Sequence, residues 1–145
     1  MNIIFKEVDK ENWEDCVDLV VSTEQKSFVA PNWYSILEAK FEEDIYPLCI
    51  YDDETMVGFL MYDLDPETNR WELSRLMIDK KYQSKGYGRI ALNQLLSILK
   101  EKLGHIKFYT SVEPENLVAK KMYESIGFKL TGEIMWEEEV MVIDL

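Results

Sequence analysis

Apolar residues recur at helical spacing in four stretches of the chain. The clearest stretch begins after Gly88 and ends at Gly104, and its leucines form one continuous stripe. A second helix is predicted over residues 32–43, and a third over residues 117–126, after a capping Asn116. Residues 11–21 predict a fourth helix, with Asp9 as its N-terminal cap.

Shorter runs of β-branched and aromatic residues predict seven strands. A turn at residues 52–54 and another at 65–69 connect three of these runs into an antiparallel meander. The last two strands are expected to meet at a turn near Gly132 and Glu133. The strand runs cover residues 2–8, 48–51, 56–62, 71–78, 106–112, 128–130 and 136–145.

The order of these elements is strand, two helices, three strands, helix, strand, helix and two strands. It predicts an α/β (mixed α+β) fold with a mostly antiparallel sheet of six to seven strands, flanked by about four helices on both faces. The two helical connections after the meander are expected to be right-handed and to join parallel strands. We expect one domain over residues 1–145, because the chain has no repeat or linker.

The composition narrows the classes of partner. Asp and Glu number 28 against 16 Lys and Arg, which gives a formal net charge of −12. Such a surface repels nucleic acids and anionic membranes and suits a small cationic molecule, although acidity for solubility alone fits the count equally well.

The remaining polar and apolar features point to an ordinary cytoplasmic protein. Cys16 and Cys49 lie in apolar-rich segments, and His105 is the single histidine. We therefore expect buried thiols, and neither a disulfide nor a metal site. No apolar run has the length of a membrane span, and charges interrupt the first ten residues, so neither a signal peptide nor a membrane anchor is expected.

The segment Gln83-Ser84-Lys85-Gly86-Tyr87-Gly88 connects the predicted strand 71–78 to the clearest helix. A glycine-bearing turn at a helix N-terminus offers backbone N–H groups to an anion such as a phosphate. Taken alone, the two glycines fit an ordinary structural turn as well, because the third glycine of a dinucleotide fingerprint and the Gly-Lys-Ser/Thr of a P-loop are absent.

A second motif lies one helix and one strand downstream, where Asn116 is followed by Tyr123 and by Gly127-Phe128. The two motifs together resemble the GNAT (GCN5-related) superfamily of N-acetyltransferases. The phosphate-binding motif of that superfamily, Gln/Arg-x-x-Gly-x-Gly/Ala, is matched at every specified position by residues 83–88.

The resemblance implies transfer of an acetyl group from acetyl-CoA to a primary amine. Tyr123 would be the general acid that protonates the departing thiolate, which is worth about 100- to 10,000-fold in rate for a well-placed group. Backbone groups at the end of the strand 71–78 would bind the pantetheine arm, the glycine turn would bind the pyrophosphate, and Asn116 would lie on the cofactor side. The implied cofactor-binding residues are Leu76, Met77, Ile78, Gln83, Ser84, Lys85, Gly86, Tyr87, Gly88, Arg89 and Asn116.

The amine must lose a proton before it attacks, because its pKa is near the roughly 10.4 of lysine. Glu72 is the first candidate for the general base, since it has the same strand parity as Ser74, Leu76 and Ile78. Glu113 and a chain of water molecules are the alternatives.

Within the superfamily, the chain resembles bacterial spermine/spermidine (diamine) acetyltransferases. The likeness rests on Glu24-Gln25 with Phe28, on the run 75–83, and on Gly132-Glu133. The implied substrate-binding residues are Glu24, Gln25, Phe28 and Glu133, with the acidic residues 137–139 nearby. Another cationic amine (an aminoglycoside, a lysine side chain or a protein N-terminus) and a non-catalytic acetyl-CoA or polyamine sensor are the alternatives. The alternating apolar residues 140–145 would suit an edge or swapped strand in a homodimer.

Overall fold

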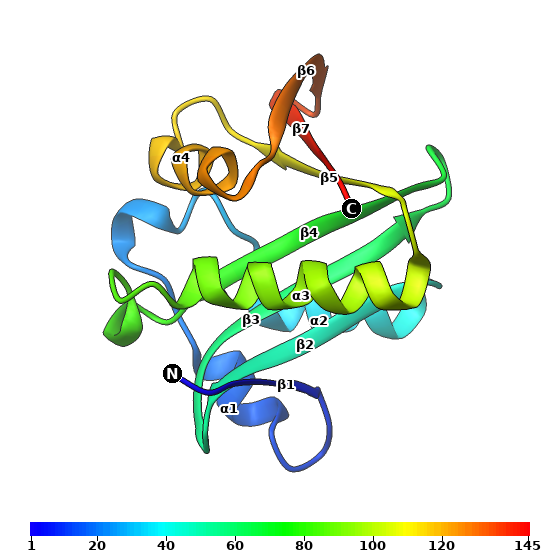
Figure 1. Ribbon diagram of the computed structural model, residues 1–145. Helices are drawn as coiled ribbons and strands as arrows, with labels where there is room; N and C mark the ends of the chain where they lie inside the picture. The colour runs from blue at the N-terminus through cyan, green and yellow to red at the C-terminus, as the bar shows by residue number, and fades with distance from the viewer.

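The computed structural model describes all 145 residues and contains one seven-stranded sheet with the order β1-β2-β3-β4-β5-β7-β6 (Figure 1). Its strands are β1 (Ile3–Glu7), β2 (Ile45–Asp52), β3 (Thr55–Asp65), β4 (Arg70–Ile78), β5 (Lys107–Val112), β6 (Lys129–Met135) and β7 (Glu138–Asp144). Its helices are α1 (Trp13–Asp18), α2 (Asn32–Phe41), α3 (Tyr87–Leu103) and α4 (Leu117–Ile126), with 3₁₀ turns η1 (Thr23–Gln25) and η2 (Lys80–Tyr82). None of these helices has the length and apolar character that crossing a membrane requires.

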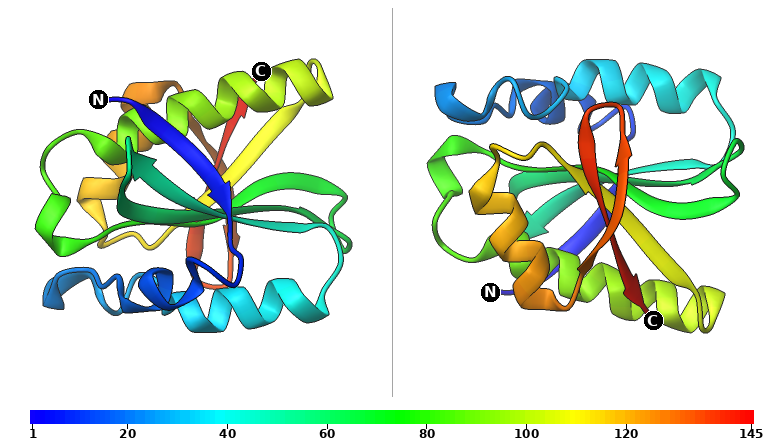
Figure 2. Two further views of the ribbon diagram at one scale, coloured as in Figure 1. Left: turned by 90° about the horizontal axis from the view of Figure 1, so that it is seen from below. Right: turned by 90° about the horizontal axis from the view of Figure 1, so that it is seen from above.

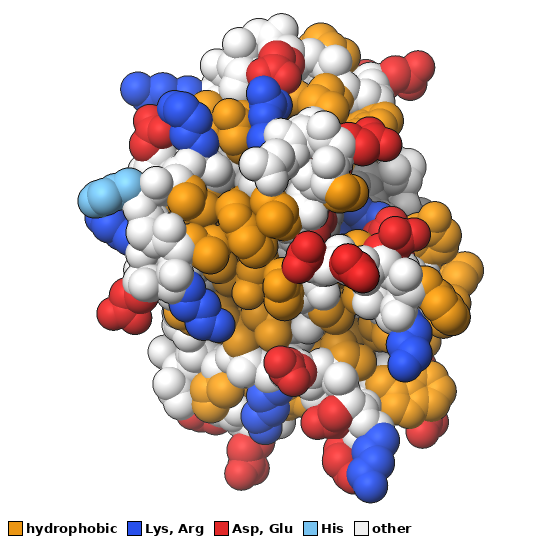
Figure 3. All heavy atoms as spheres, turned by 90° about the vertical axis from the view of Figure 1, so that its right-hand side faces the viewer, with side chains coloured by type: hydrophobic (Ala, Val, Ile, Leu, Met, Phe, Trp, Pro, Cys, Tyr) orange, Lys and Arg blue, Asp and Glu red, His pale blue; other side chains and the backbone are white.

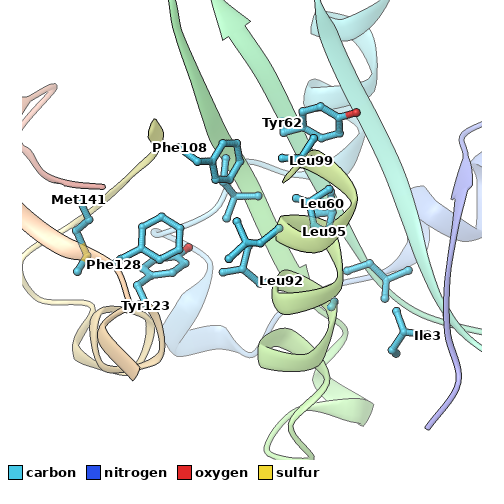
Figure 4. Close-up of a cluster of buried hydrophobic side chains, with 14 of the residues drawn as sticks. Ile3, Leu60, Tyr62, Leu92, Leu95, Leu99, Phe108, Tyr123, Phe128 and Met141 are labelled. Carbon is cyan, nitrogen blue, oxygen red and sulfur yellow. The ribbon is translucent and has the colours of Figure 1, made fainter. Parts of the chain in front are cut away.

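The sheet lies between two helical layers, with α1 and α2 on one face and α3 and α4 on the other (Figure 2). Each layer covers its own apolar core. The larger core includes the leucines of α3 and the pair Tyr123 and Phe128 (Figure 4), and the smaller one lies under α1 and α2 around Cys16 and Cys49. The predicted mixed sheet with helices on both faces is therefore confirmed, and both cysteines are free and buried as expected.

The first helix is shorter than the pattern predicted. It covers Trp13–Asp18 instead of residues 11–21. The Asp9 carboxylate accepts hydrogen bonds from the backbone N–H groups of Glu11 and Asn12, so Asp9 closes the turn before the helix and Asn12 occupies the cap position. Beyond the helix, the Val20 N–H donates to the Asp79 carboxylate at 2.9 Å, which ties the chain to the end of β4 and ends the helix early.

The turn between the last two strands lies at a different position from the predicted one. Trp136 and Glu137, with φ of 51° and 64°, form the turn between β6 and β7. Gly132, expected at the turn, lies inside β6, where its φ of 89° accompanies a break in register between Leu130 and Ile134. As a result β7 is an interior strand between β5 and β6, and the expectation of an edge strand over residues 140–145 is also wrong.

Two neighbouring strands of the sheet separate. The crossover through α3 joins β4 to the adjacent parallel β5, as predicted, but the strands pair only at Trp71 with Phe108 and at Glu72 with Tyr109. Beyond that point β4 and β5 diverge toward the side where α4 lies (Figure 1). The crossover through α4 leads to β6, which runs parallel to β5 with β7 between them. The separation opens the sheet beside β4.

A β-bulge in β4 changes which face each side chain occupies. Arg75 pairs with Met61 and Leu73 pairs with Tyr62, so Ser74 is an extra residue without a partner. Leu73 and Leu76 consequently both contact the larger core, although they are three residues apart. The parity prediction for Glu72 is therefore wrong, since Glu72 does not share a face with Leu76 and Ile78.

Candidate active site

An open cleft of about 1120 Å³ follows β4 through the gap in the sheet. One of its walls comes from β5 and α4, which contribute Thr110, Asn116 and Tyr123. The opposite wall comes from the end of α2 and the segment before it, including Phe28. The cleft is thus lined by elements from both halves of the chain, and β4 lies at its centre.

The free edge of β4 forms one part of the cleft. After the two residue pairs with β5, the one side-chain hydrogen bond that joins the two strands runs from the Thr110 hydroxyl to the Leu73 carbonyl at 3.2 Å. The backbone of residues 74–78 therefore has no strand partner on this side, although it pairs with β3 on the other. An extended ligand with amide groups can add to such an edge as a further strand.

The turn between β4 and α3 forms a second part. None of the six backbone N–H groups of residues 84–89 donates to an acceptor in the protein, and all six belong to the turn or to the first turn of the 17-residue helix α3. Free N–H groups at a helix N-terminus, together with the helix dipole, favour an anion. Ser84 and Gly86 adopt φ of 63° and 89°, and such left-handed residues curl the N–H groups into a concave cradle.

Side chains of the same motif hold this turn in place. The Gln83 side-chain amide donates 2.8 Å hydrogen bonds to the Ile78 carbonyl and to the Gln25 side chain, which fastens the turn to β4 and to η1. The Tyr87 hydroxyl donates to Asp52 at 2.6 Å. A Cβ at Gly88 would lie 3.4 Å from the Met122 sulfur of α4, so a glycine allows α3 and α4 to approach closely here. Gln83, Tyr87 and Gly88 thus position the backbone of the cradle.

Tyr123 faces the cleft from α4. Asn116 caps that helix, and its side chain accepts a hydrogen bond from the Ala119 N–H at 3.4 Å. Burial raises the pKa of Tyr123 to about 12, against a smaller opposite effect of the neighbouring Thr110 hydroxyl. The phenol therefore keeps its proton near neutral pH, as a proton donor must.

Glu72 and Asp63 form a pair of carboxyl groups in the cleft. They lie directly opposite one another in the register of β3 and β4, and both line the cleft. Burial, and then the charge of Asp63, raise the pKa of Glu72 to about 8. Burial also raises the pKa of Asp63. A carboxylate of this basicity is suited to accept a proton near neutral pH.

The cleft is strongly acidic. Ten of its lining residues are Asp or Glu, and Arg75 is the only basic one. Arg75 is already engaged, since its guanidinium donates to the Ser35 hydroxyl at 3.1 Å and lies 3.5 Å from the Glu38 carboxylate. Figure 3 views the molecule from the side of the β3–β4 turn and shows acidic side chains around and between apolar ones. The acidic lining residues are Glu38, Glu42, Glu43, Asp44, Asp63, Asp65, Glu67, Glu72, Glu113 and Glu138.

The structure brings some of the sequence-predicted substrate residues to the cleft and leaves others outside it. Phe28 lines the cleft, and Gln25 contacts the glycine turn through Gln83. Glu24 is exposed in η1 and lies outside the cleft lining. Glu133 accepts two hydrogen bonds from Arg70, at 3.0 and 3.1 Å, on the exposed end of β6 and is likewise outside.

The sequence reasoning missed Asp63. It is 8% exposed and follows a run of apolar and aromatic residues in β3. A charged residue that continues an otherwise buried strand was the signal that could have found it, because such a residue is rarely buried without a functional or ionic partner. Of the other predicted residues, Glu113 and Asn116 line the cleft, and Glu138 of the acidic run joins them.

Comparisons with known proteins agree with this geometry. Residues 7–128 match the model of the acetyltransferase (GNAT) family. The chain is 34% identical to the spermine/spermidine N(1)-acetyltransferase of Bacillus subtilis strain 168 over an alignment of 152 residues that covers 100% of both proteins. A probable spermine N(1)-acetyltransferase of Bacillus subtilis subsp. natto matches equally, with 34% identity and complete coverage of both.

Solved structures share the fold at low sequence identity. Spermidine N-acetyltransferase from Vibrio cholerae, in complex with CoA and spermine, superposes with a TM-score of 0.75 and 17% identity, covering 99% of this chain and 95% of that one. The PaiA N-acetyltransferase from Thermoplasma acidophilum, in complex with coenzyme A, gives a TM-score of 0.73 with 21% identity and complete coverage of both chains.

Proposed function

Because the chain belongs to the acetyltransferase (GNAT) family, we propose that it moves an acetyl group from acetyl-CoA to a primary amine of a polyamine such as spermidine or spermine. The observation that carries the choice of acceptor is the charge of the cleft, where ten acidic residues face one engaged arginine. A flexible polycation gains from such a lining, while apolar residues such as Phe28 can contact its methylene groups.

The residues around the gap in the sheet fit acetyl-CoA as co-substrate. The unpaired edge of β4 at Leu76, Met77 and Ile78 would bind the amide-bearing pantetheine arm, and the free N–H groups of residues 84–89 would bind the pyrophosphate. Bound acetyl-CoA supplies the activated acetyl group. Gln83 would act indirectly, through its hydrogen bonds to Ile78 and Gln25, which hold both sites in one geometry.

The chemistry that remains for the protein is proton transfer. The ammonium group of the acceptor must lose a proton, and Glu72 would take it, because its raised pKa brings it nearer to that of the amine. The departing thiolate must be stabilised, and Tyr123 would donate its phenolic proton, which its raised pKa retains. The second proton that the nitrogen loses as the amide forms would then restore the phenol. The amine nitrogen attacks the acetyl carbonyl directly, so no acetylated form of the protein is required.

A panel of amines tests the proposal. Release of free thiol from acetyl-CoA would be followed with spermidine, spermine, putrescine, an aminoglycoside and a lysine-containing peptide. We expect the highest kcat/KM with spermidine or spermine, because their several ammonium groups can each contact carboxylates along the cleft. A higher kcat/KM with the peptide or the aminoglycoside would refute the polyamine assignment, and cofactor binding without thiol release would indicate a sensor.

A further inference from the structure

Asp63 is a buried acidic side chain in the interior strand β3. It is 8% exposed, lines the cleft, and has hydrogen bonds with the side chains of Ser74 and Glu72 but no ion pair with a basic residue. The two arginines of the neighbouring strand β4 have other partners, because Arg75 contacts Glu38 and Arg70 contacts Glu133. A carboxyl group is expensive to bury without a basic partner, so its presence here needs a reason.

The residue directly opposite Asp63 in the sheet carries a second carboxyl group. Glu72 lies opposite it in the ladder of β3 and β4, where side chains on the same face are about 4.5–5.5 Å apart at Cβ. The bulge at Ser74 sets this register, since without it the two strands would pair one residue differently. Like charges directly opposite in a ladder repel each other, and a proton shared between them removes the repulsion.

We propose that Asp63 and Glu72 form one proton-accepting carboxyl pair, in which Asp63 is the positioning residue that makes Glu72 a stronger base. The inference rests on the proposed function. In the step, an N–H bond of the acceptor ammonium breaks, its electron pair stays on the nitrogen, and an O–H bond forms on Glu72. The pair then holds one proton between two carboxyl groups, and its charge changes from −2 to −1.

Other charged groups around the pair modulate it. Asp65 on β3 and Glu38 on α2 add negative charge near Asp63, and Asp65 also acts on Glu72. Arg70 on β4 acts weakly in the opposite direction on Glu72, because Glu133 already neutralises it. On the remaining sides lie Tyr109 of β5, opposite Glu72, and Asp44 before β2. The direct partner of Glu72 in this environment is Asp63.

The test is the pH dependence of kcat/KM with spermidine for Asp63→Asn, which keeps the shape and removes the charge. In the wild-type protein kcat/KM should increase with pH, and in the variant we expect the midpoint of this increase to move to lower pH by at least one unit. The maximal kcat/KM should fall about 3- to 30-fold, since a weaker base removes the proton less well. The Kd for acetyl-CoA should stay within twofold. Asp65→Asn is the matched control and should move the midpoint by less than 0.3 unit, an estimate from its greater exposure and distance of two residues.

A second measurement needs no activity and keeps failure of the pair distinct from failure of the proposed function. Carboxyl-carbon NMR of the free wild-type protein should show the Asp63 and Glu72 signals titrating together in two steps, one of them above pH 7. In Asp63→Asn the upper step should disappear. Independent titration of both signals near pH 4, or an unmoved pH profile in the variant, would overturn the inference, even if spermidine is acetylated.

Discussion

Replacing Glu72 with Gln should stabilise the folded protein while it removes the proposed base. The folded pKa of Glu72, about 8, lies above its value of about 4.3 in an unfolded chain. Ionisation of Glu72 therefore favours unfolding. The protonated Glu72 carboxyl contributes fully to stability below about pH 4. This contribution decreases as the pH rises and is lost by about pH 8.

The size of the effect follows from these two pKa values. If the whole difference in pKa acted on stability, ionisation of Glu72 would lower the free energy of unfolding by about 3.6 kcal/mol at pH 7 and by about 1 kcal/mol at pH 5. Glu72 is only partly buried, so solvent screening reduces these values, and we expect a gain of about 1–2 kcal/mol at pH 7 and less than about 0.5 kcal/mol at pH 5 for Glu72→Gln. At this chain length the gain at pH 7 corresponds to a Tm increase of about 3–8 °C.

Thermal or denaturant unfolding at pH 5, 7 and 8 measures the difference in stability between the variant and the wild-type protein. Steady-state kinetics measure the loss of activity. The same variant should lose about 100-fold or more in kcat, since a general base contributes 100- to 10,000-fold. Glu133→Gln is the control with the opposite sign, because Arg70 lowers the pKa of Glu133 and the substitution should slightly reduce stability at neutral pH. A loss of stability in Glu72→Gln that is equal at all three pH values would refute the linkage argument, and unchanged kcat would shift the role of base to Glu113 or water.

Two further substitutions test the cofactor side. Tyr123→Phe should lower kcat about 100-fold or more and leave the Kd of acetyl-CoA within about twofold, because only the proton donor is lost; steady-state kinetics and calorimetric binding measure the two, and unchanged turnover would exclude Tyr123 as the acid. Gly86→Ala should weaken acetyl-CoA binding about 3- to 10-fold, since a Cβ meets open space there but the φ of 89° strains alanine and displaces the cradle. Gly104→Ala, at the other end of α3 with φ of 75° and open space, is the control; equal losses of affinity in both variants would show that the turn has no special part in binding.

Local sequence patterns predicted the elements whose position depends on neighbouring residues in the chain. The leucine stripe of α3 packs against the sheet as expected, with Gly104 at its C-terminal end. The two motifs around Gly86 and Tyr123 were identifiable because a tight turn and a capped helix each require particular residues at fixed spacing. For α3, the glycine turn and α4, local sequence was therefore enough to predict where each element lies and what backbone geometry it has.

Contacts between distant segments decided what the patterns missed. The early end of α1 depends on the bond from Val20 to Asp79, two residues that are far apart in the chain. The interior position of Gly132 within β6 depends on how that strand pairs with β7. The face occupied by Glu72 depends on a bulge that exists only as a relation between β3 and β4. Alternation along one strand cannot reveal a residue that its partner strand skips.

The bulge at Ser74 also explains how one strand could contribute to both proposed substrate sites. Before it, Glu72 faces Asp63 across the β3 ladder and pairs with Tyr109 of β5, so it is held on both sides. After it, β4 has no partner on the β5 side, and its free edge leads into the N–H groups of the glycine turn. A regular strand would have aligned Glu72 with Leu76 and Ile78 toward the larger core, on the face opposite to Asp63. The extra residue would therefore place the proposed proton acceptor and the proposed cofactor-binding edge on one strand while their side chains lie on different faces.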